Sequence, residues 1–346
     1  MTDELINQLE QLDPVDGERL RTRNPPEAEL AEILAADPVA TDRGSPRPRL
    51  LRPARVLPVA ALAAAAIIAI TALLPGDERG AASAAAKALE SAAATAAAEP
   101  ASPADGQFTY FRTLSTSNGT VGGPTTRDSY TWLIPITVEQ WVAPDGSGRI
   151  RTVAGKAEFP DPDDVQDWRR SGSPRLGDPP GTVTERRPGP GELDGVPYEG
   201  GLPPVSELPA DPDELESIFR DVHAVDGGDV PVEAKLFEYA ASVLLCTGTR
   251  PELRAAVYEM AAGIDGVELK GELRDPLGRP GTGVSIETAY SGAPIRHTLI
   301  FDSETSYPLA HTQTPTGQPD HLLIKVPPVY TVLEETAAVA DMHTRP

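Results

Sequence analysis

The most constraining feature of this sequence is an uncharged apolar run at 56–74. Its nineteen residues would form a helix about 28 Å long, close to the roughly 30 Å hydrocarbon core of a bilayer. We therefore predict a single transmembrane helix over this range. The side chains expected to anchor it in lipid are aliphatic: Val56, Leu57, Leu62, Ile67, Ile68, Ile70, Leu73 and Leu74.

Two other interpretations of the run stay open on the sequence. Ala82-Ser83-Ala84 resembles the A-x-A site of a cleaved signal peptide, although the stretch before it is much longer than a usual leader. A helix buried in a soluble core would also be apolar. The length of the run and the arginines before it favour the membrane span.

The flanks of the run predict its orientation. Arginines precede it and acidic residues follow it, and cytoplasmic flanks of membrane spans carry an excess of Lys and Arg. This places the N-terminus in the cytoplasm and everything after Leu74 outside the cell membrane. The residues expected to set this topology are Arg47, Arg49, Arg52 and Arg55.

The charge of the chain argues against one class of partner. The formal net charge is -22 over 346 residues, whereas nucleic-acid binding needs clustered Lys and Arg that neutralise phosphates. We therefore expect no nucleic-acid partner. The single cysteine, Cys246, has no second cysteine to pair with, so the outer domain depends on its hydrophobic core. Cys246 itself is expected to be a buried small side chain.

Residues 1–55 form an acidic segment that is too short to bury a core. Apolar side chains recur at helical spacing at 2–12 and 27–36. These patterns predict a mostly disordered tail with short amphipathic helices, or a segment that docks on a cytoplasmic protein. The tail contains neither His nor Cys, which excludes a zinc-binding module of the anti-sigma type there.

The part after the span is predicted to be an α+β domain, with a curved antiparallel β-sheet packed against helices. An Ala-rich helix and linker at 75–106 precede it, the domain covers 107–333, and 334–346 form a C-terminal tail. Strands are expected at 107–114, 130–142, 149–153, 267–274, 283–290, 294–301, 308–314 and 321–326. Helices are expected at 81–98, 211–220, 232–247 and 251–263, the last opened by a capping box at 249–252. The Pro/Gly-rich stretch 155–210 is expected to be a long loop.

No motif in the sequence identifies a reaction. A phosphate-binding loop ending in Lys-Ser or Lys-Thr, a G-x-S-x-G elbow and a helix with paired histidines are all absent. We therefore assign no catalytic, cofactor-binding or metal-binding residue. A metal site from His297, His311 and His321 is geometrically possible because they lie on or near neighbouring predicted strands. Strand histidines, however, more often face solvent or a hydrogen-bond partner.

The order of features resembles a known family. A short acidic tail and an Arg-flanked, Ala-rich span are followed by PELRAAVY at 251–258, GVEL at 266–269, DPLGR at 275–279, and IFD at 300–302 with YPL at 307–309. This combination is similar to uncharacterised single-pass, membrane-anchored proteins of actinobacteria, over roughly residues 47–333. The resemblance implies an envelope location but no activity and no site residue. At the level of fold, the layout also resembles the outer domains of lipoprotein carriers and of envelope-stress regulators that bind anti-sigma factors.

Three hypotheses about function follow. The first is a non-enzymatic, membrane-anchored extracytoplasmic binding or sensor protein, with an anti-sigma-like regulatory role through its tail. The second is a carrier-like domain that binds a lipid or lipoprotein. The third is an extracytoplasmic hydrolase or metalloenzyme. The expected partners are the membrane, a cytoplasmic protein at the tail, and a lipid or envelope protein at the outer domain.

Overall fold

The computed structural model describes residues 78–99, 108–122, 129–195, 201–226, 228–246, 249–290, 293–317 and 326–346. All of them belong to one compact unit of the chain, Ile68–Pro346. The predicted span at 56–74, its anchoring side chains, the arginines before it and the tail lie outside the described residues. Within the described ranges, no helix combines the length and the apolar character that crossing a membrane requires.

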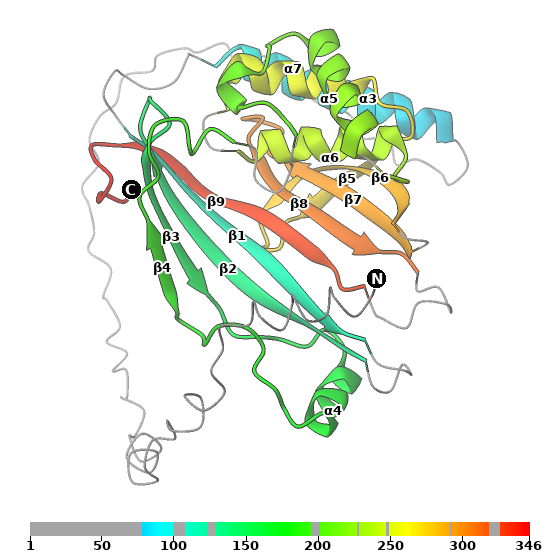
Figure 1. Cartoon of the computed structure of the whole chain (residues 1–346). Coiled ribbons are helices and arrows are strands. Elements are labelled where there is room, and N and C mark those ends of the chain that lie inside the picture. The colour runs from blue at the N-terminus through cyan, green and yellow to red at the C-terminus, as the bar shows by residue number, and fades with distance from the viewer. Residues whose placement is uncertain are drawn as a thin grey trace, which may run out of the picture. The chain divides into compact units, whose positions relative to one another are not determined.

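The described residues form an α+β fold on a nine-stranded antiparallel sheet, which confirms the predicted fold class at that level (Figure 1). The strand order is β4-β3-β2-β1-β9-β8-β7-β6-β5. The strands of one half are β1 (Phe108–Val121), β2 (Tyr130–Val142), β3 (Gly148–Ala154) and β4 (Val183–Arg186). Those of the other half are β5 (Glu268–Arg274), β6 (Pro280–Tyr290), β7 (Ala293–Phe301), β8 (Pro308–Pro315) and β9 (Val329–Val339). The succession β5 to β8 is the predicted meander.

Strand β9, which joins the two halves, has no counterpart among the predicted strands. The sequence suggests that Pro327 and Pro328 end the last predicted strand, 321–326, most of which lies outside the described residues. Strand β9 begins directly after the two prolines and pairs with both β1 and β8. Prolines ahead of a strand do not interrupt its ladder, because they lie outside the hydrogen-bonded register. As a result, the residues that follow Val339 lie next to the ends of β1 and β2.

The helices α3 (Glu78–Ala97), α5 (Pro212–Asp226), α6 (Val232–Leu244) and α7 (Pro251–Ala262) lie where the sequence predicts helices. The prediction of one long loop at 155–210 is wrong, since its described residues include α4 (Pro162–Arg170), β4 and a 3-10 turn. Asp161 caps α4 by accepting a hydrogen bond from the backbone N–H of Asp163, and Pro162 begins the helix. This cap-and-proline start explains how a helix forms within a Pro-rich stretch.

The helical layer encloses the largest hydrophobic core together with β6 and β7. Helix α3 packs on α7 and β5, and α6 lies on β6, β7 and β8. The stripe that α3 buries consists of small or aliphatic side chains: Ala85, Leu89, Ala92, Ala93 and Ala96. Cys246 is 5% exposed in the same core, which confirms its predicted burial.

The predicted capping box at the start of α7 is wrong. Arg250 occupies the N-cap position of α7, and no side chain caps the helix there. The hydroxyl of Thr249 instead donates to the carbonyls of Val243 and Cys246, over 2.6 and 3.2 Å. Thr249 therefore satisfies carbonyls at the end of α6, which a helix terminus leaves without intrahelical partners.

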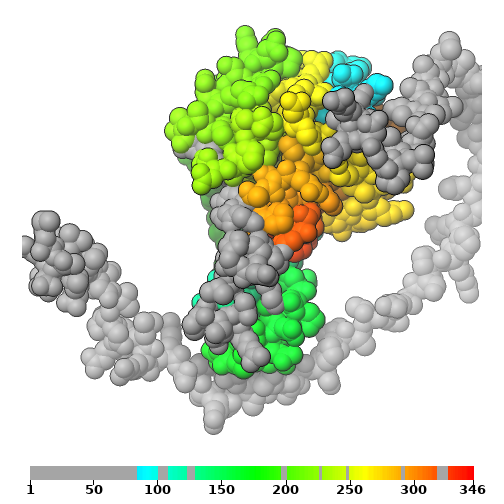
Figure 2. Space-filling model, turned by 90° about the vertical axis from the view of Figure 1, so that its right-hand side faces the viewer, coloured from blue at the N-terminus to red at the C-terminus, as the bar shows by residue number. Residues whose placement is uncertain are grey.

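Helices cover the two halves of the sheet unequally. Figure 1 shows α3, α5, α6 and α7 gathered over β5 to β8, whereas β1 to β4 extend beyond them. Figure 2 shows the same separation from the side, with α5, α6 and α7 in yellow-green and yellow, α3 in cyan and the region from β2 to β4 in green. In the middle of β2, residues 132–138 are all partly exposed. This half of the sheet therefore leaves apolar side chains accessible.

Candidate functional site

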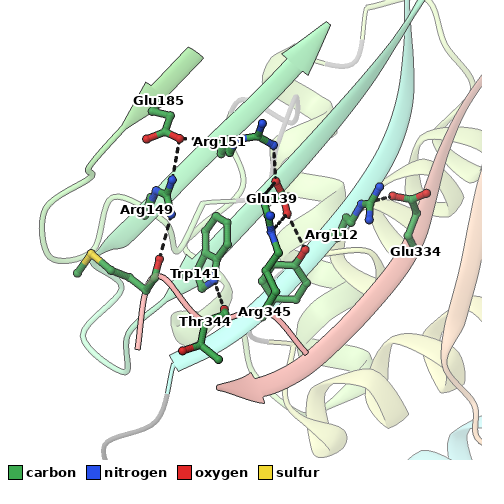
Figure 3. A network of polar contacts seen from close by, with 11 residues as sticks. Arg112, Glu139, Trp141, Arg149, Arg151, Glu185, Glu334, Thr344 and Arg345 are labelled. Carbon is green, nitrogen blue, oxygen red and sulfur yellow. Dashed lines mark hydrogen bonds and ion pairs between the residues drawn. The ribbon is translucent and has the colours of Figure 1, made fainter. Parts of the chain in front are cut away.

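A buried carboxylate, Glu139 on β2, is the centre of a polar network on the half of the sheet that α3, α5, α6 and α7 do not cover (Figure 3). Its residue is only 3% exposed. The carboxylate accepts hydrogen bonds from the Tyr110 hydroxyl at 2.9 Å and from Arg151 Nη1 at 2.7 Å. It also accepts from Arg345, with Nε at 2.6 Å and Nη2 at 2.8 Å. Side chains from β1, β3 and the segment after β9 thus converge on one group.

These contacts fix the charge of the network. Burial alone raises the pKa of Glu139, but hydrogen bonds from Arg345, Arg151 and Tyr110 outweigh burial and hold that pKa below its ordinary value. Burial, followed by the hydrogen bond to Glu139, raises the pKa of Tyr110 to about 12. At neutral pH the site is therefore an ionised carboxylate that accepts from a neutral phenol and two guanidinium groups.

The network continues to both neighbouring strands. Arg149 donates to Glu185 on the edge strand β4 at 2.7 Å, and Arg112 on β1 is paired with Glu334 on β9 at 2.7 Å. The side chain of Glu185 is 46% exposed, so water screens this outer pair, whereas Glu139 is shielded. The electrostatic strength of the network is therefore concentrated at Glu139.

The segment 340–346 lies across this network. The indole Nε1 of Trp141 donates to the carbonyl of Thr344 at 2.6 Å, and Arg149 Nη1 donates to the carbonyl of Met342 at 3.4 Å. The Met342 side chain packs against a small cluster of Tyr110, Trp141 and Val339. The sheet thus holds the segment by its main-chain carbonyls, by one apolar side chain and by the Arg345 guanidinium.

Two of the three predicted histidines meet. His297 on β7 and His311 on β8 stack with ring centroids 5.5 Å apart and an interplanar angle of 28°. Both are buried, and His297 Nδ1 and His311 Nε2 have no hydrogen-bond partner among the described residues. Burial lowers the pKa of both imidazoles, that of His311 to about 3. The pair is therefore neutral at physiological pH.

The three-histidine arrangement that the sequence leaves geometrically possible is not tested in full, because His321 lies outside the described residues. No group of three or more His, Cys, Asp or Glu side chains within the described ranges is arranged to hold a metal ion. The charged residues facing the pair come from α6, where Lys235 and Glu238 form an ion pair of 3.1 Å.

On the opposite face of β2 from Glu139 lies an apolar stripe of Ile134, Ile136 and Val138, because successive strand residues alternate between faces. These side chains are partly exposed. A loop passes over one end of the stripe, since a Cβ added at Gly177 would lie 2.6 Å from Ile134 Cδ1. The stripe is thus apolar, uncovered along part of its length and bordered by a loop.

Cavities adjoin both halves of the sheet. One of about 520 Å³ lies at the start of β2, next to Thr131. Its walls are mainly apolar and include Pro160, Pro315, Val326, Pro327 and Pro328. A second, of about 590 Å³, lies beside the first turn of α6 and is acidic, with Glu233, Asp265, Glu268 and Glu287. Both volumes fall within the roughly 300–1,000 Å³ typical of small-ligand sites.

Comparison of the chain with models of known protein families, with characterised proteins and with solved structures finds no match. Function must therefore be argued from the geometry itself. The sequence analysis missed the Glu139 network. A usable signal was present, because Glu139 is the only charged residue of strand 130–142, and the turn at 144–148 places Arg151 directly opposite it.

Proposed function

We propose that this chain is a non-enzymatic, single-pass membrane protein whose extracytoplasmic domain binds the acyl chain of a lipid or lipoprotein. Its N-terminal tail would convey the bound state to a cytoplasmic protein. The anchor at 56–74 and the orientation rest on the apolar run and the arginines that precede it. The ligand assignment rests on one observation, the partly exposed apolar stripe of Ile134, Ile136 and Val138.

The shape of the stripe favours an extended apolar ligand. Residues 132–138 span about 20 Å at the rise of a β-strand, which suits a long acyl chain. The residues paired with the stripe on β1 are Thr113, Ser115 and Ser117, so no charge borders the stripe on that strand. Adjacent apolar side chains that stay partly exposed, as those of the stripe do, can form a binding surface.

The ligand assignment is tested by native mass spectrometry of the full chain purified from membranes in mild detergent. We expect the wild type to carry the added mass of a bound lipid. Ile136→Asp should lose that mass, because a carboxylate buried against an acyl chain loses its hydration and gains no hydrogen bond. Thr137→Asp is the matched control, since it places the same charge on the other face of β2. Absence of bound lipid in the wild type, or equal loss in both variants, would refute the assignment.

The signalling half is tested separately with the tail. Cross-linking from residues 1–55 should capture one defined cytoplasmic protein, and Ile136→Asp should change the yield of that cross-link. A scrambled tail of the same composition is the control. Equal capture by the native and scrambled tails would refute the signalling role, and the ligand assignment would stand or fall by its own test.

A further inference from the structure

We propose that the Glu139 site is a recognition site for a protein segment folded into an Asx turn, with an arginine three residues after an apolar side chain, and that residues 341–345 occupy it in cis. The site lies on the face of β2 opposite the apolar stripe, so this proposal is independent of the lipid assignment. The ligand it fits is a partner protein with an exposed segment of the pattern apolar-x-x-Arg.

The acceptor is built by the sheet alone. Tyr110 and Arg151, on the strands that flank β2, hold the Glu139 carboxylate from two sides. The side chain of Glu139 is 5% exposed, whereas that of Arg345 is 54% exposed. The buried carboxylate of Glu139 thus binds the guanidinium of a side chain that is largely exposed to solvent. The two donors of the guanidinium, Nε and Nη2, bind the two carboxylate oxygens side by side, a geometry that a lysine cannot reproduce.

The remaining contacts of the site bind the main chain of the segment and one apolar side chain of it. Trp141 and Arg149 donate to the carbonyls of Thr344 and Met342. Both carbonyls belong to a turn that Asp341 closes by accepting from the backbone N–H groups of His343 and Thr344. The side chains of His343 and Thr344 are exposed. Selectivity therefore comes from the two side chains that the sheet contacts, Met342 in the aromatic cluster and Arg345 on Glu139.

Replacement of the tethered segment by a partner's segment does not leave the Glu139 carboxylate without hydrogen-bond partners. When Arg345 leaves, Glu139 keeps its hydrogen bonds from Arg151 and Tyr110, so the penalty for an isolated buried carboxylate is avoided. The tethered segment competes with an effective concentration in the millimolar range, as expected for a short linker. A partner segment therefore binds strongly only when it outcompetes the tether or when the tether is weakened.

The experiment uses a labelled peptide of residues 340–346 (ADMHTRP) and fluorescence anisotropy. The chain shortened by removal of residues 341–346 should bind this peptide at least tenfold more tightly than the wild type. In the wild type, the tethered copy of the segment competes with the peptide for the site. Replacing the peptide arginine by lysine or alanine, or making Glu139→Gln in the protein, should weaken binding at least tenfold. No binding to the shortened chain, or binding indifferent to the arginine, would overturn the proposal.

A second variant guards against loss of folding in the shortened chain. Full-length Arg345→Ala keeps the Trp141–Thr344 and Met342 contacts and so should remain folded. It should bind the peptide more tightly than the wild type, although less tightly than the shortened chain. Equal affinity of Arg345→Ala and wild type would show that Arg345 does not occupy a site open to exchange.

Discussion

Arg345 and Glu139 are 206 positions apart in the sequence, yet two hydrogen bonds of 2.6 and 2.8 Å join the guanidinium to the carboxylate. Arg345 follows β9, and Glu139 lies on β2, with β1 between the two strands. The contact therefore forms only when the last strand has paired with the first. This ion pair is a marker of the completed sheet rather than of any local hairpin.

Removal of the Glu139 charge should destabilise the domain. Glu139→Gln keeps the shape of the side chain but leaves the guanidinium groups of Arg151 and Arg345 without their buried anion. We expect the free energy of unfolding to fall by about 2 kcal/mol, because a shielded, charge-assisted network is lost. Urea unfolding followed by circular dichroism measures the change.

The matched control for this prediction is Glu185→Gln. Glu185 contacts Arg149 and Arg151 of the same network, but its side chain is 46% exposed. Pairs in such positions contribute little, so Glu185→Gln should behave as wild type in the same urea unfolding measurement. Similar losses for both variants would show that burial of Glu139 does not set the strength of the network.

Gly148→Ala should disrupt the hairpin between β2 and β3. A Cβ at Gly148 would collide with the backbone carbonyl oxygen of Trp141, which cannot move without breaking the register of the two strands. We expect a loss of about 2 kcal/mol or more in the free energy of unfolding. Gly195→Ala is the control, since a Cβ there meets nothing within 4 Å. Wild-type stability of Gly148→Ala would contradict the close approach.

The sequence predicted the strands and helices whose signals are local. The signals for the helices that begin at 211–212 and 251, for the strands 130–142 and 149–153 and for the four strands between 267 and 314 all depend on neighbouring residues, and the structure has these elements. Strand β9 was missed because its place is decided by pairing with β1, whose residues lie more than two hundred positions earlier. Long-range pairing of this kind is invisible to a local pattern.

The same reason explains what was missed at the site. The stacking of His297 and His311 was predictable, since both lie on neighbouring strands of a meander. The Glu139 network was not predictable in full, because Arg345 reaches it only through the position of β9. The local part, Arg151 opposite Glu139 across a short turn, was within reach of the sequence.

Helix α3 should be an integral part of the domain. Leu89 is fully buried in the largest hydrophobic core, and α3 packs on α7 and β5. Leu89→Ala would leave a cavity, and we expect the free energy of unfolding to fall by about 2–5 kcal/mol. Lys87→Ala, on the exposed face of the same helix, should change it by less than about 0.5 kcal/mol. A small effect of Leu89→Ala would mean that α3 detaches readily from the core.

The stacked histidines should make the domain sensitive to mild acid. Burial lowers the pKa of His311 to about 3 and also lowers that of His297, whereas the unfolded chain titrates near 6.5. Below pH 6.5 the unfolded chain therefore takes up protons that the folded pair does not, and the stability falls as the pH falls. No stability is lost through these groups above that range.

The size of this effect follows from linkage. Between pH 6.5 and 5.5, exclusion of a proton from His311 should lower the free energy of unfolding by about 1 kcal/mol. This fall in the free energy of unfolding should be absent in His311→Leu, because leucine cannot titrate. It should persist in His343→Asn, which removes an exposed imidazole. Urea unfolding at the two pH values measures both slopes. Equal slopes in wild type and His311→Leu would mean that His311 takes up a proton in the folded domain as readily as in the unfolded chain, and so that burial does not lower its pKa.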